Sequence, residues 1–233
     1  MQAVILVAGE GKRMQPLTFE RPKPLIEVAG KPLLEHIIDA LPEEITDLIL
    51  VIGYKGDMIK DHFGSEYRGR SVQYIEQGEP LGTGHALSLA KPLLSGRFLL
   101  MFGDDIHGAE ALKELIEKPS GILVAESPTP ERFGVVYVNP DGTMQKIVEK
   151  PARPESNLVY AGPMVLDERI FDFPAPRNEN GEYYLTDSFT QYAAVHPAYV
   201  VRQPLWISIG YPEDIKKAED ALKAINVEPG RSL

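Results

Sequence analysis

The sequence predicts an α/β fold in which a doubly wound, mostly parallel sheet is flanked by helices on both faces. Two observations carry this prediction: short uninterrupted apolar runs recur along the chain, and helix-like amphipathic segments lie between them. A strand that is apolar along its whole length suits a parallel sheet buried on both faces. Strand–helix alternation is typical of a doubly wound topology. The 233 residues can build one sizeable core and do not require two domains.

The expected strands and helices follow one another in chain order. The four apolar runs predict strands at residues 3–7, 48–52, 98–102 and 121–125. Apolar residues at helical spacing predict helices at residues 33–41, 84–90, 109–117 and 215–225. Pro212 and Asp214 near the start of the last segment are typical of a helix amino terminus.

The pattern changes after about Pro128. Residues 133–138 alternate apolar and polar, and the turn sequence at 139–142 (Asn-Pro-Asp-Gly) leads into residues 143–148. We therefore expect a β-hairpin excursion that covers one edge of the mixed sheet and forms a lid over a site. Residues 174–181 are rich in Pro, Asn and Gly and are expected to form a loop.

Composition excludes several classes of protein. The formal net charge of -10 disfavours long nucleic acids as partners, because phosphate neutralisation needs clustered Lys and Arg. The chain contains no Cys, which rules out disulfides and thiolate metal sites and fits the cytoplasm. The first apolar run is too short to cross a membrane, and no charged region precedes it. We expect a cytoplasmic protein without a membrane partner.

A glycine-rich loop follows the first expected strand and is a candidate phosphate site. Gly9 and Gly11 allow close backbone approach, so that successive N–H groups can cradle phosphate oxygens, and Lys12 and Arg13 add positive charge. Ligands of open α/β sheets bind at the carboxyl ends of strands, where this loop lies. The loop matches neither of two familiar motifs. A Walker loop needs Ser or Thr where Arg13 stands, and the dinucleotide-binding motif needs a third Gly where Met14 stands. A solvated glycine turn is the alternative.

Two further segments carry charged candidates. In Pro22-Lys23-Pro24 the prolines are expected to hold Lys23 in extended backbone, where its ammonium group can meet a phosphate. An exposed lysine in a proline turn is the alternative. Asp104 and Asp105 follow the third apolar run, and a carboxylate at a strand's carboxyl end is a suitable ligand for Mg²⁺. A helix cap or turn is the other interpretation, and it suits Asp105 better.

The loop and Pro22-Lys23-Pro24 together resemble the signature of the sugar-1-phosphate nucleotidylyltransferases, GxGxR(M/L)xPLT followed by PKP. The likeness continues along nearly the whole chain. It includes a nucleobase segment at 76–86, a (Y/F)GV segment at 133–135, an EKP segment at 149–151 and a segment beside the sugar pocket at 182–187. The resemblance implies a single Rossmann-like domain over residues 1–233, with nucleotide binding in about 1–125 and sugar binding in about 126–225. Because the sequence carries no long carboxyl-terminal extension, we expect no β-helical acyltransferase domain.

Residue roles carried over from the resemblance fall into three groups. The catalytic group is Arg13, Lys23 and Asp104. The nucleotide-binding group is Ala8, Gly9, Gly11, Lys12, Gln77, Gly82 and Thr83. The substrate-binding group is Gly134, Glu149, Lys150 and Gly162, although Tyr160 stands where the family's NAG segment has Asn.

The main departure from the family lies at Ser208, where the family usually has a second aspartate on the metal. Three interpretations remain open. The metal is held by Asp104, the triphosphate and water; another carboxylate such as Asp105 or Asp214 substitutes; or the protein binds more than it turns over. We favour the first, because the loop arginine and the phosphate-binding lysines are intact.

The expected function is transfer of a nucleoside monophosphate from a nucleoside triphosphate, UTP or dTTP, to a sugar 1-phosphate, with glucose 1-phosphate favoured and Mg²⁺ as cofactor. One alternative is a cytidylyltransferase for an alcohol phosphate such as phosphocholine. Another is a catalytically weak regulatory protein that binds a nucleotide sugar. The sequence leaves a homo-oligomer open.

Overall fold

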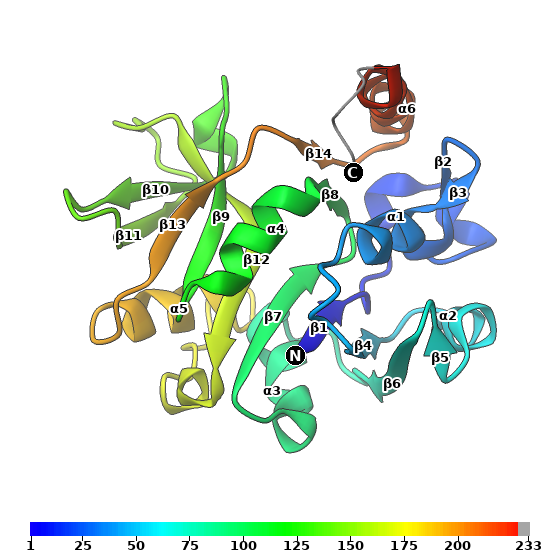
Figure 1. Ribbon diagram of the computed structural model, residues 1–233, viewed down its shortest axis with the longest axis horizontal. Coiled ribbons are helices and arrows are strands. Elements are labelled where there is room, and N and C mark those ends of the chain that lie inside the picture. Colours follow the sequence, from blue (N-terminus) through cyan, green and yellow to red (C-terminus); the bar gives the residue numbers. More distant parts are fainter. Residues whose placement is uncertain (228–233) are drawn as a thin grey trace.

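A computed structural model describes residues 1–227, with side chains to residue 224 (Figure 1). The single-domain prediction also included residues 228–233, which lie outside the described part. The strands are β1 Gln2–Leu6, β2 Glu27–Val28, β3 Lys31–Pro32, β4 Asp47–Ile52, β5 Glu66–Tyr67, β6 Arg70–Glu76, β7 Arg97–Phe102, β8 Asp105–His107, β9 Gly121–Glu126, β10 Gly134–Val138, β11 Met144–Glu149, β12 Leu158–Asp167, β13 Tyr199–Arg202 and β14 Trp206–Ser208. The α-helices are α1 Leu33–Asp39, α2 Gly56–Phe63, α3 Thr83–Ala90, α4 Ala109–Glu117, α5 Leu185–Ala193 and α6 Pro212–Val227.

One large mixed sheet organises the molecule. Its order is β11-β10-β12-β7-β1-β4-β6-β5, and β9 and β13 extend it from β12. The central strands β7, β1, β4 and β6 are parallel, as are β9 and β13. Strand β12 runs antiparallel to both β7 and β9. The predicted doubly wound, mostly parallel sheet with flanking helices is confirmed.

The uninterrupted apolar runs exist because the central strands are buried on both faces. In β1, Ala3 and Ile5 belong to one hydrophobic core and Val4 to the other, and all three are fully buried. Strand β4 alternates in the same way, with Leu50 in the first core and Val51 in the second. The four strands predicted from these runs are confirmed as β1, β4, β7 and β9.

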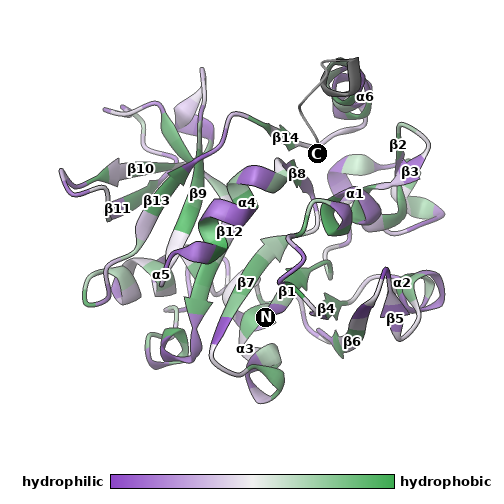
Figure 2. Ribbon diagram, in the orientation of Figure 1, coloured by the Kyte–Doolittle hydropathy of each residue, from purple (hydrophilic) through white to green (hydrophobic). Residues whose placement is uncertain are grey.

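Helices cover both faces of the sheet. Helices α1, α2 and α4 contribute side chains such as Ile37, Phe63 and Leu112 to the first core. Helices α3 and α5 pack against each other and supply Leu87 and Phe189 to the second. Figure 2 shows the apolar strands lying between these layers. The four predicted helices are confirmed as α1, α3, α4 and α6.

The predicted hairpin is present as β10 and β11, which pair antiparallel through Val135 and Val148. Its turn closes where the backbone N–H of Asn139 donates to the carbonyl of Thr143 over 2.8 Å. The hairpin adds to the sheet through β12. Its role as a lid stays a prediction.

Several elements lacked a clear periodic signal. Strand β6 has only Val72 buried, because it lies near the sheet edge. Strand β12 is continuous, but its pairing with β9 shifts register between Tyr160 and Met164. The two-stranded ribbon of β8 and β14 joins Asp105 to Ser208, two segments far apart in the sequence.

Among the described residues, none of the helices combines the length and the apolar character that a membrane crossing requires.

Candidate active site

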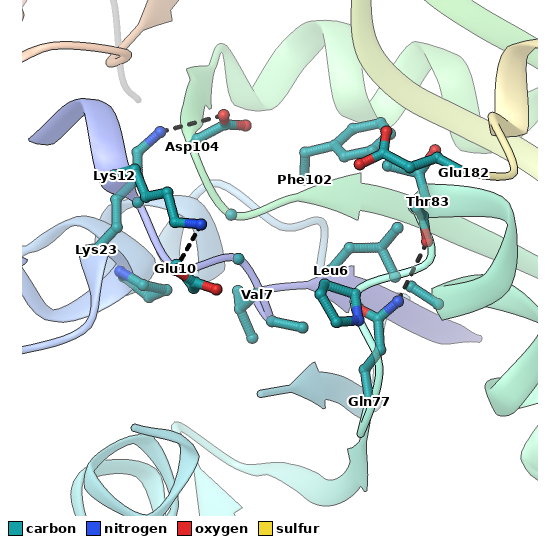
Figure 3. A pocket seen from close by; sticks show the side chains of 18 of the residues that line it. Leu6, Val7, Glu10, Lys12, Lys23, Gln77, Thr83, Phe102, Asp104 and Glu182 are labelled. Atoms are coloured by element: carbon teal, nitrogen blue, oxygen red, sulfur yellow. Dashed lines mark hydrogen bonds and ion pairs between the residues drawn. The ribbon is translucent and has the colours of Figure 1, made fainter. Parts of the chain in front are cut away.

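A cavity of about 640 Å³ opens at the carboxyl ends of the central parallel strands. Figure 3 shows Lys12, Lys23 and Asp104 on one side of it, Gln77, Thr83, Phe102 and Glu182 on the other, and Leu6 and Val7 between them. The predicted catalytic and nucleotide-binding residues all line this cavity. The complete lining is Leu6, Val7, Ala8, Gly9, Glu10, Gly11, Lys12, Arg13, Lys23, Pro24, Gln77, Pro80, Gly82, Thr83, Ala86, Phe102, Gly103, Asp104, Glu182 and Tyr184.

The two loop glycines differ in what the fold demands of them. Gly11 has a φ of 63°, and a Cβ there would lie 2.9 Å from the Thr18 methyl carbon and 3.2 Å from the Lys23 Cβ. A Cβ at Gly9 would have nothing within 4 Å. Gly11 is therefore fixed by the protein's own packing. Gly9 is free of such a constraint and lines the open cavity.

The loop cations are partly engaged by neighbours. Lys12 Nζ lies 3.1 Å from a carboxylate oxygen of Glu10, and both side chains are exposed. The Arg13 guanidinium stacks over the ring of Tyr211 at 5.2 Å. An exposed pair such as Lys12 and Glu10 contributes at most about 1 kcal/mol, so an incoming phosphate can displace it.

Lys23 and Asp104 form an ion pair at the cavity wall. Lys23 Nζ lies 3.1 Å from Asp104 Oδ2, and the Lys23 side chain is 11% exposed against 40% for Asp104. The expectation of extended backbone at Lys23 is wrong. Residues 23–25 form a 3₁₀ turn in which Ile26 N–H donates to the Lys23 carbonyl. Proline is tolerated in the first turn of a helix because its missing N–H would have no partner there.

Asp105 is a buried strand residue, so its interpretation as a helix cap or turn residue is wrong. Its Oδ2 accepts a hydrogen bond of 3.0 Å from the Trp206 indole, and its Oδ1 has no partner among the described residues. Burial, helped by the charge of Asp104, raises the pKa of Asp105 to about 7. Burial also lowers the pKa of the neighbouring His107 to about 4.

The donor set fits a magnesium ion that takes few protein ligands. Asp104 offers an accessible carboxylate, and no group of three or more His, Asp or Glu among the described residues could hold a metal. Asp105 is buried against Trp206, and Asp214 accepts from the N–H groups of Gly210 and Tyr211 at the start of α6. Mg²⁺ commonly binds through one or two carboxylates, substrate phosphates and water, which suits this arrangement.

The nucleobase segment forms the opposite wall. Gln77 follows β6, and its backbone N–H donates to the Ile52 carbonyl over 2.8 Å. Gly82 has a φ of 95° and precedes α3, where a Cβ would lie 2.7 Å from the Tyr183 carbonyl oxygen. The loop at Tyr183 thus packs closely against the turn that carries Gly82 and Thr83. His85 does not line this cavity but lines an adjacent one.

The predicted sugar residues gather beside the cavity without lining it. A Cβ on Gly134 would lie 3.2 Å from Glu149 Oε2 and 3.8 Å from the Tyr160 Cβ, so these three residues are neighbours. Tyr160 packs edge-on against the cavity residue Phe102, with ring centroids 6.4 Å apart. A Cβ on Gly162 would likewise lie 3.4 Å from Phe102.

Lys150 is exposed and forms an ion pair with its neighbour Glu149. Its Nζ lies 3.6 Å from Glu149 Oε1, and the Lys150 side chain is 66% exposed. The hydroxyl of Tyr160 donates to the Gly162 carbonyl, and burial raises its pKa well above the usual value. Tyr160 is therefore a neutral donor whose proton already has a partner.

Sequence reasoning left several lining residues out of its site groups. Phe102 lies directly before Gly103-Asp104, and the end of a buried strand was the signal that could have found it. Glu182 and Tyr184 belong to a segment that only the family resemblance singled out, and a loop brings them to the cavity. Gly103 itself is required because a Cβ there would collide with the Val7 side chain.

The chain is similar to several known proteins. A family model described as nucleotidyl transferase matches residues 2–224. A bifunctional protein GlmU of Methanocaldococcus jannaschii is 36% identical over 225 residues, which are 95% of this chain and 54% of that protein. A UTP–glucose-1-phosphate uridylyltransferase, AglF of Haloferax volcanii, is 36% identical over 237 residues, covering 96% of this chain and 97% of that protein.

Among solved structures, a protein assigned as a glucose-1-phosphate thymidylyltransferase of Bacillus anthracis, crystallised with sucrose, superposes with a TM-score of 0.84. The two are 25% identical, and the match covers 98% of this chain and 97% of that one. The chain thus spans about half the length of the bifunctional relatives and nearly all of the uridylyltransferase and of this structure.

Proposed function

The chain belongs to the nucleotidyl transferase family, and from this premise we propose that it transfers a nucleoside monophosphate from UTP or dTTP to a sugar 1-phosphate, with release of pyrophosphate. Glucose 1-phosphate is the favoured acceptor. The uridylyltransferase relative and the matching solved structure support this choice through the activities in their names. Three predicted catalytic residues, Arg13, Lys23 and Asp104, line one cavity with the base segment, and this observation carries the proposal.

The cavity divides into regions that suit the parts of the substrates. The glycine loop and Arg13 would hold the β and γ phosphates, and Gln77, Gly82 and Thr83 would hold the base. The nucleotide would thus bind in residues 1–125. The cluster of Gly134, Glu149 and Tyr160 beside Phe102 would receive the sugar within residues 126–225.

Members of the family are generally metal-dependent, and we assign Mg²⁺ to Asp104. When bound there, the ion would neutralise charge on the reacting phosphates. Asp104 would exchange its partner Lys23 for the ion. The freed ammonium group of Lys23 would then be available to the α-phosphate.

The reaction needs no protein nucleophile. A phosphate oxygen of the sugar 1-phosphate forms the new bond to the α-phosphorus, and the bond from that phosphorus to the bridging oxygen breaks in line, so that pyrophosphate leaves with the electron pair. The acceptor is already an anion. Catalysis then consists of positioning and of offsetting repulsion, with Arg13 and Lys23 as the local cations.

Pyrophosphate release from a matrix of substrates tests the proposal. UTP, dTTP, CTP, ATP and GTP would each be paired with glucose 1-phosphate, other sugar 1-phosphates and phosphocholine. We expect turnover with UTP or dTTP and a sugar 1-phosphate. Turnover only with CTP and phosphocholine would establish the alcohol-phosphate alternative, and tight binding without pyrophosphate would establish the regulatory one.

A matched pair of lysine variants links the activity to this cavity. Lys23→Ala should lower kcat on the order of a hundredfold, as expected for a charge that acts at the transition state. Lys31→Ala is the control, since Lys31 also forms an ion pair, at 2.6 Å with Asp39, but does not line the cavity. Equal activity of the two variants would contradict the assignment.

A further inference from the structure

The side-chain amide of Gln77 is held by two partners. Its Nε2 lies 3.2 Å from the Gly82 carbonyl oxygen and 3.2 Å from His85 Nδ1. Figure 3 shows Gln77 reaching from the end of β6 toward the start of α3, where the first of these hydrogen bonds is drawn. An amide nitrogen has two N–H groups, so these contacts use both.

The Gly82 carbonyl decides which way the amide faces. It is a fixed acceptor, because it also receives the N–H of Ala86 over 3.1 Å at the start of α3. An inverted amide would place Oε1 against this carbonyl, and two acceptors would face each other with no proton between them. The nitrogen of Gln77 must therefore point to Gly82.

His85 is the second partner of the Gln77 amide nitrogen. Since the Gln77 nitrogen can only donate, Nδ1 of His85 must accept, and a neutral ring then carries its proton on Nε2. The ring lines an adjacent, largely apolar cavity of about 330 Å³ together with Leu87 and Phe171. His85 is absent from the nucleotide cavity lining, so any effect on the base passes through Gln77.

One polar atom of the amide remains for a ligand, and it is the acceptor Oε1. Uracil and thymine present a ring N–H between two carbonyl groups, which matches an acceptor. Cytosine in the same position presents a bare ring nitrogen, and its lone pair would meet Oε1 without a proton. A buried mismatch of this kind lowers affinity more than a lost contact does.

We propose that His85 is a positioning residue that holds Gln77 with Oε1 toward the base, so that the site selects uracil or thymine over cytosine. The inference rests on the proposed function, because it assumes that a nucleotide occupies the cavity. Without His85, one hydrogen bond to Gly82 remains, and the amide gains freedom to turn its other N–H toward the base.

Binding of UDP and CDP to the full chain, measured by calorimetry with magnesium present, tests the proposal without requiring turnover. The wild-type protein should bind UDP at least about tenfold more tightly than CDP. His85→Phe keeps a planar ring in the apolar cavity but removes the acceptor, and should reduce the ratio of the two affinities several-fold. His85→Asn places an oxygen near the position of Nδ1 and should retain most of the ratio.

Two further variants separate positioning from a structural effect. Ser188→Ala changes the same apolar cavity from α5 without touching Gln77, and should keep the wild-type ratio. Gln77→Ala removes Oε1 and should lower the ratio even if His85→Phe fails to fold. Equal affinities of the wild type for UDP and CDP, or an unchanged ratio in His85→Phe or Gln77→Ala, would overturn the proposal.

Failure of this inference can be told apart from failure of the proposed function. If the wild type releases pyrophosphate with UTP and a sugar 1-phosphate while His85→Phe keeps the wild-type ratio of UDP to CDP affinity, only the positioning role is wrong. If neither UDP nor CDP binds, the nucleotide site itself is wrong, and the inference falls with it.

Discussion

At the scale of single residues, the glycine loop separates what the fold needs from what a ligand needs. The two glycines of the motif look equivalent in the sequence. In the structure Gly11 has a left-handed backbone and would clash with Thr18, whereas Gly9 has free space above its Cα. Only the constraint on Gly11 comes from the protein itself. The free space at Gly9 leaves room for a ligand, which we expect to be a phosphate.

Substitution by alanine should therefore have opposite consequences at the two positions. Gly11→Ala should lower the free energy of unfolding by about 1–2 kcal/mol or more, because an L-residue pays that much for left-handed backbone. Gly9→Ala should change it by less than about 0.5 kcal/mol, yet weaken triphosphate binding on the order of tenfold or more. Urea unfolding and nucleotide titration of both variants measure the two effects. A stable Gly9→Ala protein with unchanged affinity would show that phosphates bind elsewhere.

At the scale of elements, the ribbon of β8 and β14 supports the end of β7 where Asp104 lies. Trp206 in β14 donates to Asp105 in β8, and the Ile209 N–H donates to the Asp104 carbonyl over 3.0 Å. The ribbon thus holds the carbonyl of the candidate metal ligand and the residue that directly follows it. It also buries two titratable groups, Asp105 and His107, close together.

These two groups should give opposite pH dependences of stability. The pKa of Asp105 rises from 3.8 to about 7 on folding, so its contribution to stability is lost as pH rises through that window. The pKa of His107 falls from 6.5 to about 4, so its contribution is lost as pH falls from 6.5. Between about pH 4 and pH 6.5 the two slopes oppose each other.

Asp105→Asn should leave the pH dependence of stability that comes from His107 without the opposing contribution of Asp105. Asparagine can still accept the Trp206 hydrogen bond but does not ionise, so the variant should gain stability relative to the wild type as pH rises from about 4 to about 7. Urea unfolding in EDTA measures this difference. Asp57→Asn, at a side chain that is 91% exposed, should follow the wild-type profile. A constant difference between Asp105→Asn and wild type would mean that Asp105 is already ionised in the folded protein at low pH.

The sequence predicted the elements whose burial shows in a local pattern of apolar residues. It missed the elements that are defined by contacts between distant parts of the chain. The fully apolar runs of β1, β4 and β7 reflect burial on both faces, a local property of the sequence. The ribbon that pairs residues 105–107 with 206–208 has no local signal, because neither short strand is stable alone. The misassignment of Asp105 followed from this, since its burial depends on Trp206, about one hundred residues away.

The candidate site shows the same division. The glycine loop, Lys23 and Asp104 could be found because each directly follows a strand or a recognisable motif. Their common cavity confirms that they come together, while their roles stay predictions. Glu182 and Tyr184 reach the cavity through a loop, whose path is set by hydrogen bonds such as that from the Tyr183 N–H to the Leu81 carbonyl.

At the scale of the whole molecule, charge argues for a metal ion. The chain carries a formal net charge of -10, so its overall field opposes a polyphosphate. The cavity does not reverse this, because its lining holds as many acidic as basic side chains: Glu10, Asp104 and Glu182 against Lys12, Arg13 and Lys23. The cationic side chains alone therefore attract a triphosphate only weakly, and a divalent ion would supply the additional positive charge.

Removal of magnesium should accordingly weaken triphosphate binding by on the order of tenfold or more. Ser208 offers a sharper test, because it pairs with Asp105 in the ribbon. The family resemblance leads us to expect a second metal ligand at this position. Ser208→Asp should strengthen triphosphate binding in magnesium and weaken it in EDTA, since the same carboxylate binds the ion in one case and repels the phosphates in the other. Ser208→Asn adds similar bulk without charge. This variant should neither strengthen triphosphate binding in magnesium nor weaken it in EDTA. Weaker binding of Ser208→Asp under both conditions would mean that position 208 does not face the ion, and that Asp104 holds the metal without a second carboxylate.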